Sequence, residues 1–303
     1  MGSSYTSQNQ SAADQLRQLV SLKRFYGKQA ENLARVNLRE IRHAETCLTE
    51  YCGIELKGLK ILEIGPGQLL GQLPYLALHN EVIGVDYDVV PQGFDLPKYM
   101  RMLAKNGPVR TVKTIGRKVL GVDRRYRAQL KKELAVDYLP RVEVRSADVL
   151  NLPFDSDSFD LVYTRAVFQH LPDAGGAIRE IHRVLRSAGI AFVSLQPYTS
   201  PTASLDLRVL YGGIQNEIGV WPHLRPELKD QIKPNATLNR FGLKDWKALF
   251  STHCQSPKFV LTKVADEYIP VAVKLKESGH LQEYSIEELT TGALDVMFRK
   301  TTS

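Results

Sequence analysis

Short apolar runs alternate with helical patterns along this chain, and that alternation sets strong limits on its fold. Five β-like runs occupy residues 57–65, 81–88, 141–149, 159–167 and 189–197. The segments between them have the period of a helix, as in residues 175–186, where Ile178 and Ile181 share one face. Strands that alternate with helices pair in parallel through right-handed crossovers. The sequence therefore predicts a doubly wound α/β sheet.

The two ends of the chain extend this pattern. Residues 11–57 repeat apolar side chains at helical spacing without a proline, which predicts N-terminal helices. Residues 258–264 and 293–300 are two more β-like runs, expected to close the sheet as a terminal strand pair. We predict an N-terminal helical cap at 1–57 and one further domain at 58–303, with insertions at 90–138 and 199–240.

The composition is that of a soluble globular protein in a reducing compartment. Hydrophobic residues make up 43% of the chain and charged residues 24%, and no run approaches the length of a transmembrane helix. The three cysteines lack metal-ligand spacing, which favours free thiols in the cytoplasm. We also expect no metal site, because no set of carboxylates or histidines has ligand spacing.

A tight glycine turn, "ILEIGPGQLLG" at residues 61–71, follows the first predicted strand. Glycines at this point let a ligand approach the backbone, because no Cβ is in the way. Asp86 ends the second strand, where a carboxylate can accept hydrogen bonds from both ribose hydroxyls of a nucleoside. The dinucleotide fingerprint G-x-G-x-x-G does not fit, since Leu70 takes its sixth position. The turn alone is compatible with an NAD site or an adenosyl site.

The rest of the chain separates these two possibilities. "ILEIGPG", "VIGVDYD" and "SADVLNLPFDSDSFDLVYTRAVFQHLPD" occur in order. As a set they closely resemble the class I S-adenosylmethionine-dependent methyltransferases, in particular the small-molecule group with "LPF…SFD" before strand four. The resemblance covers roughly residues 58–198. It implies a Rossmann-like, seven-stranded, mostly parallel sheet with its last strand antiparallel, and S-adenosyl-L-methionine as the cofactor.

The resemblance also implies which residues hold that cofactor. Residues matching Gly65 and Gly67 pass beside its methionine portion, and Glu63 supports their loop. The acid matching Asp86 holds the ribose. Contacts to the adenine are implied for Tyr87, Asp148 and Val149, and further cofactor or substrate contacts for Thr164 and Arg165.

Each of these assignments has a structural alternative. Gly65 and Gly67 could serve only to make a tight strand-to-helix turn, and Glu63 could cap it. Asp86 could cap a helix, and Asp148 could be a turn former.

Methyl transfer to a hydroxyl needs positioning and benefits from a base near the acceptor's proton. His170, after strand four, is the first candidate for this base, although a histidine there often only packs against the cofactor. His223 is the rival, if it points inward. We favour His170 slightly, because its position is better determined from the sequence.

The segment at 199–240 is too long for a simple crossover and is predicted to be a lid or binding loop. Together with Tyr198 after strand five, we expect Tyr211, Trp221 and Arg225 to contact the substrate. The alternative is that Tyr211 and Trp221 merely pack the insertion against the domain.

The other insertion is strongly basic. Residues 98–132 hold twelve Lys or Arg and one acid, Asp123, which gives +11 in a chain whose net charge is +7. Three helices are predicted here, with Asp123 capping the third and an apolar face on the second made by Val112, Ile115 and Val119. The segment is either a solvated basic face or a surface for an anionic partner. In the second case we expect the acceptor to be attracted by Arg117, Lys118, Arg124, Arg125 and Arg127.

These observations predict a cytoplasmic methyltransferase acting on a small or medium acceptor, most simply at a hydroxyl of a sugar, glycan or other secondary metabolite. An anionic acceptor is one alternative within this class, and the oligomeric state is left open. The basic insertion raises an RNA methyltransferase as the alternative, but no RRM or KH motif accompanies it. "YTRAVF" also lacks the Asn/Asp-Pro-Pro-aromatic motif of many enzymes that methylate nitrogen in RNA bases. A non-catalytic S-adenosylmethionine-binding module is the third possibility.

Overall fold

The computed structural model describes residues 12–93 and 95–301. Its strands are β1 (Lys60–Ile64), β2 (Glu81–Asp86), β3 (Glu143–Ser146), β4 (Phe159–Arg165), β5 (Leu185–Leu195), β6 (Lys258–Lys263) and β7 (Thr291–Arg299). Its α-helices are α1 (Ala12–Cys52), α2 (Leu73–Leu76), α3 (Leu96–Asn106), α4 (Pro108–Val119), α5 (Val122–Leu134), α6 (Ala174–Val184), α7 (Leu207–Gly212), α8 (Leu243–His253), α9 (Tyr268–Glu277) and α10 (Ile286–Thr290). Three short 3₁₀ helices are η1 (Phe168–His170), η2 (Gly213–Gln215) and η3 (Pro226–Gln231).

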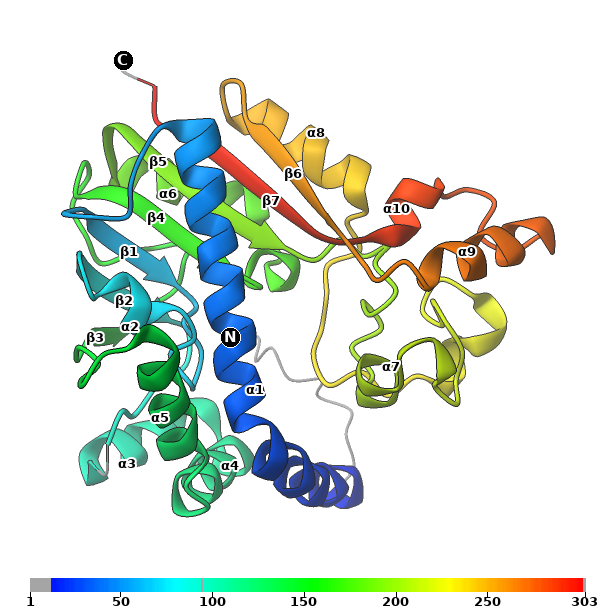
Figure 1. Cartoon of the computed structure of the whole chain (residues 1–303), viewed down its shortest axis with the longest axis horizontal. Helices are drawn as coiled ribbons and strands as arrows, with labels where there is room; N and C mark the ends of the chain where they lie inside the picture. Colours follow the sequence, from blue (N-terminus) through cyan, green and yellow to red (C-terminus); the bar gives the residue numbers. More distant parts are fainter. Residues whose placement is uncertain (1–11, 94, 302–303) are drawn as a thin grey trace. The chain divides into compact units, whose positions relative to one another are not determined.

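The seven strands form one sheet in the order β3-β2-β1-β4-β5-β7-β6 (Figure 1). β1 pairs in parallel with β2 and β4, and β2 pairs in parallel with β3. β6 and β7 pair antiparallel. The predicted doubly wound sheet and its antiparallel terminal pair are therefore confirmed.

The described chain groups into two compact units. The N-terminal unit comprises residues 12–164 and 180–192, and the C-terminal unit comprises residues 165–179 and 193–301. These bounds differ from those predicted from the sequence, and residues 1–11 of the predicted helical cap lie outside the described residues. The division into a cap and one domain stays a prediction.

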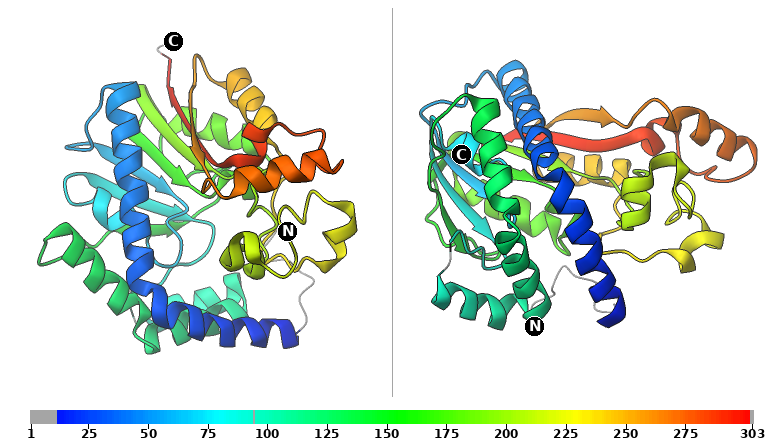
Figure 2. Two further views of the ribbon diagram at one scale, coloured as in Figure 1. Left: turned by 45° about the vertical axis from the view of Figure 1, so that its right-hand side comes forward. Right: turned by 60° about the horizontal axis from the view of Figure 1, so that its bottom comes forward.

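In the N-terminal unit, β1 is a central strand with Ile61 and Leu62 fully buried, as expected for a parallel strand covered on both faces. β3 is the edge strand. The long helix α1 packs along α5, which belongs to the basic insertion (Figure 2). The N-terminal helix α1 thus fixes the insertion to the unit.

The three predicted helices of the basic insertion are present, but one detail differs from the prediction. Asp123 is not the cap of α5, since Gly121 takes that position in the left-handed region at φ +68°. Asp123 instead lies in the first turn, and its carboxylate pairs with Arg117 of α4 at 2.5 Å. The predicted apolar face of α4 is present and is exposed, while the buried side chains of this helix are Thr111 and Thr114.

The C-terminal unit has its own apolar core. Trp246 and Phe250 of α8 are fully buried, and Phe168 packs against both rings. A second cluster forms around Trp221, whose ring meets Tyr268 of α9 edge-to-face. The insertion at 199–240 is therefore packed down by aromatic contacts along part of its length.

Candidate functional site

The glycine turn after β1 folds as the first part of the candidate site. Gly65 and Gly67 lie in the left-handed region at φ +74° and +66°, which glycine adopts without strain. The Gly65 N–H donates to the carbonyl of Val85 at 2.7 Å, which ties the turn to the end of β2. A Cβ built on Gly67 would meet no atom within 4 Å. The backbone at Gly67 therefore faces open space that a ligand can approach.

Asp86 holds the turn from the end of β2. Its Oδ2 accepts the N–H of Gly67 at 3.0 Å, and its Oδ1 accepts the N–H of Asp88 at 2.9 Å. A carboxylate has about four acceptor positions, so these bonds leave room for two more. Burial raises the pKa of Asp86 to about 6, and the two backbone donors oppose that rise. At neutral pH this carboxylate is mostly ionised and can accept the hydroxyls of a ribose.

Glu63 is a residue of β1 and precedes the glycine turn. Its side chain is 2% exposed, and its Oε2 has no hydrogen-bond partner among the described residues. Burial, and secondarily the charge of Asp86, raise the pKa of Glu63 to about 8. Glu63 is therefore mainly protonated at neutral pH.

The residues predicted for the adenine lie around the ends of β2 and β3. The N–H of Ala147 donates to the carbonyl of Asp86 at 2.9 Å and joins the two strand ends. Asp148 is exposed, and its Oδ1 accepts the N–H of Leu150 at 3.0 Å, so it does form a turn. Val149 is buried, and the ring of Tyr87 lies 4.9 Å from the Nζ of Lys105.

The remaining predicted cofactor contacts, Thr164 and Arg165, are the last two residues of β4. Thr164 is fully buried, and its Oγ1 lacks a hydrogen-bond partner in the described part of the chain. Arg165, which follows it, belongs to the C-terminal unit and is half-buried.

Sequence reasoning missed the groups that brace the glycine turn from outside. The Tyr126 hydroxyl of α5 donates to the carbonyl of Gly71 at 3.0 Å and accepts from the Asn37 Nδ2 of α1 at 2.9 Å. From α4, Arg117 donates to the carbonyl of Gln68 at 2.8 Å. No motif marks these side chains, because they lie in helices that are distant from the turn in the sequence.

The basic residues proposed to attract an anionic acceptor have different surroundings. Arg117 and Lys118 are mostly buried and both pair with Asp123, so internal pairing engages two of them. Arg125 lies 3.7 Å from Glu31 of α1. Arg124 is exposed and Arg127 is half-buried.

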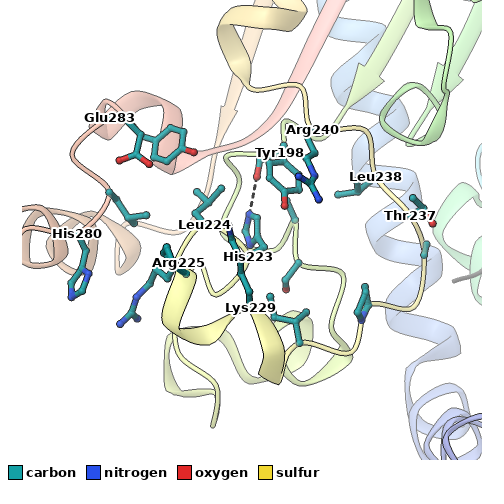
Figure 3. Close-up of a pocket in the computed structure, with 18 of the residues that line it drawn as sticks. Tyr198, His223, Leu224, Arg225, Lys229, Thr237, Leu238, Arg240, His280 and Glu283 are labelled. Atoms are coloured by element: carbon teal, nitrogen blue, oxygen red, sulfur yellow. Dashed lines mark hydrogen bonds between the residues drawn. The ribbon is translucent and has the colours of Figure 1, made fainter. Parts of the chain in front are cut away.

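The C-terminal unit contains a cavity of about 850 Å³ (Figure 3). Tyr198, His223 and Arg225, all predicted from the sequence to serve the acceptor, line it. Residues that sequence reasoning missed complete the lining, among them Lys229, Thr237, Arg240, His280, Glu283 and Tyr284. They come from the end of the 199–240 insertion and from the segment between α9 and α10, and neither region carries a recognisable motif.

His223 is the polar group best suited to chemistry in this cavity. It is 5% exposed, and its Nε2 lies 2.8 Å from the carbonyl of Tyr198 (Figure 3). A carbonyl only accepts, so Nε2 carries the hydrogen and the neutral ring has its lone pair on Nδ1. Nδ1 is buried without a partner among the described residues. Burial lowers the pKa of His223 to about 4, which keeps the ring neutral at physiological pH.

His170 is the second candidate base. It is half-buried in η1, and its Nδ1 lies 2.7 Å from the carbonyl of Thr237, a residue that lines the cavity. That bond places the hydrogen on Nδ1 and the lone pair on Nε2. Burial lowers the pKa of His170 below its usual value.

Two predicted substrate residues lie away from the cavity lining. Trp221 is fully buried in the aromatic cluster, where its Nε1 donates to the carbonyl of Thr199 at 3.1 Å. The alternative interpretation of Trp221 as a packing residue is the one its surroundings support. Tyr211 lies in the last turn of α7 and is 55% exposed. Within the described chain, no three His, Cys, Asp or Glu side chains are placed to hold a metal ion.

Comparison with known proteins gives partial matches to methyltransferases. Residues 100–193 match the family model described as "Methyltransferase domain". A sarcosine/dimethylglycine N-methyltransferase of Halorhodospira halochloris is 44% identical over 61 residues, 20% of this chain and 21% of that protein. A probable S-adenosylmethionine-dependent methyltransferase of Mycobacterium tuberculosis H37Rv is 37% identical over 75 residues, 21% of this chain and 27% of that protein.

Among solved structures, an S-adenosylmethionine-dependent methyltransferase from Mesorhizobium loti aligns with a TM-score of 0.44 at 17% identity, covering 81% of this chain and 93% of that one. The matches to the two curated relatives span about a quarter of their length or less. The predicted family and cofactor class are supported by the family model and by these relatives.

Proposed function

We propose that this chain, a member of the class I S-adenosylmethionine-dependent methyltransferases, transfers a methyl group from S-adenosyl-L-methionine to a hydroxyl of a small or medium acceptor. The observation that carries the proposal is the link between the glycine turn and Asp86. The carboxylate that is expected to hold the ribose also accepts the N–H of Gly67 at 3.0 Å. The same group therefore sets the turn and keeps acceptor positions for a ligand.

The residues of the N-terminal unit fit this cofactor. Gly67 faces open space, Asp86 has unused acceptor positions, and the Thr164 hydroxyl at the end of β4 has no partner among the described residues. When bound, S-adenosylmethionine supplies a methyl group that its sulfonium already activates. The protein therefore mainly has to hold and orient the reactants.

The cavity of the C-terminal unit is proposed to receive the acceptor. His223 lines the cavity, and its buried Nδ1 has no partner among the described residues, which suits a base for a hydroxyl that must lose its proton. In this proposal His223 would take the hydroxyl proton at Nδ1 when the acceptor oxygen receives the methyl group. We now favour His223 over His170 as the base, because His223 itself lines the cavity.

The charges around the cavity favour an anionic acceptor. Arg225, Lys229 and Arg240 line it, although Glu227 pairs with Arg225 at 2.9 Å. Tyr198 and Tyr284 add aromatic surface, on which a sugar or another ring can pack. A phosphorylated or carboxylated sugar, glycan or secondary metabolite is the acceptor class that this lining supports best.

Calorimetry with S-adenosylhomocysteine tests the cofactor-binding part of the proposed function. Asp86→Ala removes two charge-assisted hydrogen bonds to ribose, each contributing about 1.5 to 3 kcal/mol, so affinity should fall by about a hundredfold or more. Asp86→Asn keeps one acceptor oxygen and should weaken binding less. Asp155→Ala, in an exposed loop, is the matched control and should bind like wild type.

Circular dichroism must first show that each variant is folded, because Asp86 also holds the glycine turn. Unchanged affinity in a folded Asp86→Ala variant would overturn the assignment. Tight binding of NAD by the wild type would do the same.

A further inference from the structure

Two neighbouring helices of the basic insertion expose apolar side chains in a regular stripe. On α4, Val112, Ile115 and Val119 recur at i, i+3 and i+7 and are 55%, 39% and 71% exposed. On α3, Leu96, Met100 and Leu103 recur at i, i+4 and i+7 and are 74%, 59% and 42% exposed. Side chains at these spacings lie on one face of a helix. We call the two stripes together the α3–α4 surface. The helices that carry them, α3 and α4, are joined at Gly107 (Figure 1).

The segment that carries this surface is also basic. Residues 96–120 contain seven Lys or Arg and no acid. Three of these cations are paired in the fold, Arg110 with Asp88, and Arg117 and Lys118 with Asp123. On α3, Lys98, Arg101 and Lys105 line a second cavity, of about 900 Å³, together with Arg141 and Arg145 from the region of the edge strand β3. Glu143 is the single acid of that lining, and it pairs with Arg145. Helix α3 thus carries both an apolar stripe and the cations of a basic cleft.

We propose that the α3–α4 surface docks this protein on an anionic lipid bilayer. Helices with an apolar side and flanking Lys and Arg lie in the plane of a membrane interface, with apolar side chains at the acyl boundary and cations among the headgroups. No helix in the described chain is long and apolar enough to cross a membrane, so the contact is peripheral.

Charge and composition favour a bilayer over the other occupants. A second copy of this chain would bring the same basic segment to a two-fold contact, so like charges would oppose one another. An anionic bilayer complements both features at once.

Vesicle co-sedimentation of the full chain tests the proposal. Binding is expected to vesicles of phosphatidylcholine with a quarter phosphatidylglycerol, and to be at least tenfold weaker to phosphatidylcholine alone. The triple variant Val112→Ser, Ile115→Ser, Val119→Ser should lose at least tenfold in binding to the anionic vesicles. Ile269→Ser with Val273→Ser is the matched control, because both side chains are exposed on α9, at 37% and 39%, and should bind like wild type.

A second readout does not depend on loss of binding. Trp221 and Trp246, the chain's two tryptophans, are fully buried. The tryptophan introduced by Val119→Trp is exposed, so changes in its fluorescence emission can be distinguished from that of the two buried rings. Its emission should shift to the blue on addition of anionic vesicles and become protected from an aqueous quencher.

Three outcomes would overturn the proposal. They are equal binding by wild type and the triple serine variant, unchanged Val119→Trp emission in the presence of anionic vesicles, and a wild-type dimer in sedimentation velocity that the triple serine variant abolishes. The last would assign the α3–α4 surface to a second copy.

Discussion

Replacing Tyr126 by phenylalanine tests whether the basic insertion supports the glycine turn. The change removes one hydroxyl from a residue that is 1% exposed, and the ring stays in place. That hydroxyl donates to the Gly71 carbonyl at 3.0 Å and accepts from Asn37 at 2.9 Å. Each bond contributes about 0.5 to 1.5 kcal/mol net, and an unsatisfied buried partner costs about 1 to 3 kcal/mol. We therefore expect a loss of about 2 kcal/mol of stability in the N-terminal unit.

Part of this loss should appear as weaker cofactor binding. Gly71 ends the glycine turn, and without its hydrogen bond the turn samples conformations that a ligand must first suppress. If about 1 kcal/mol of the loss acts on the turn in this way, affinity for S-adenosylhomocysteine falls by about fivefold. Calorimetry gives the affinity, and thermal unfolding followed by circular dichroism gives the stability.

Tyr138→Phe is the matched control, because Tyr138 is 74% exposed and precedes β3 outside the turn. It should change neither quantity. A Tyr126→Phe protein with wild-type melting temperature and wild-type affinity would refute the reasoning. A lower melting temperature with unchanged affinity would confine Tyr126 to a structural role.

Two further predictions concern titratable groups. The pKa of Glu63 is raised to about 8, so the folded state keeps a proton that the unfolded state releases, and stability of the cofactor-free protein should fall as pH rises from about 4.5 to 8. Glu63→Gln should flatten this slope in melting temperature against pH, and an unchanged slope would contradict the assignment. His223→Asn should lower turnover by about 10² to 10⁴ while cofactor affinity is kept. With a pKa of about 4, His223 should leave wild-type activity without an acid limb near pH 6.5, and the appearance of one would point to another base.

Local sequence patterns were sufficient to predict the sheet. Every predicted strand is present, and the buried central strand β1 matches the apolar run before Gly65. For the central strands this worked because parallel strands buried on both faces must be nearly continuous in apolar residues. The position of Asp86 at the end of β2, next to the glycine turn, was predictable for the same reason, since motif and strand lie together in the sequence.

The orientation of α4 was not predictable from its own residues. The period of Val112, Ile115 and Val119 predicted an apolar face, but it could not tell whether that face is buried or exposed. In the structure, polar contacts from the opposite side decide the orientation. Arg117 reaches the carbonyl of Gln68 and pairs with Asp123, so the threonine face turns inward. Contacts with residues this distant in sequence leave no local pattern.

The cavity of the C-terminal unit was predictable only in part. Tyr198, His223 and Arg225 were identified because they lie after strand five or in a segment too long for a crossover. Trp221, in the same segment, packs into the core, because its large ring gains most from burial once its N–H finds the Thr199 carbonyl. Spacing alone cannot separate these two outcomes for neighbouring aromatic and polar residues.

The charge of the basic insertion needs two explanations. Counting acids within residues 98–132 leaves eleven cations unbalanced, but the fold brings acids from elsewhere. Asp88 pairs with Arg110 at 2.7 Å, and Glu31 lies 3.7 Å from Arg125. These pairs fix the insertion to the unit and explain the cations on its inner side.

The pairs do not explain why the α3–α4 surface exposes apolar stripes in the same helices as the remaining cations. A merely solvated basic face has no need of those stripes, and an anionic acceptor alone would not use them. The combination favours a partner that is both anionic and apolar, and a bilayer surface has both properties.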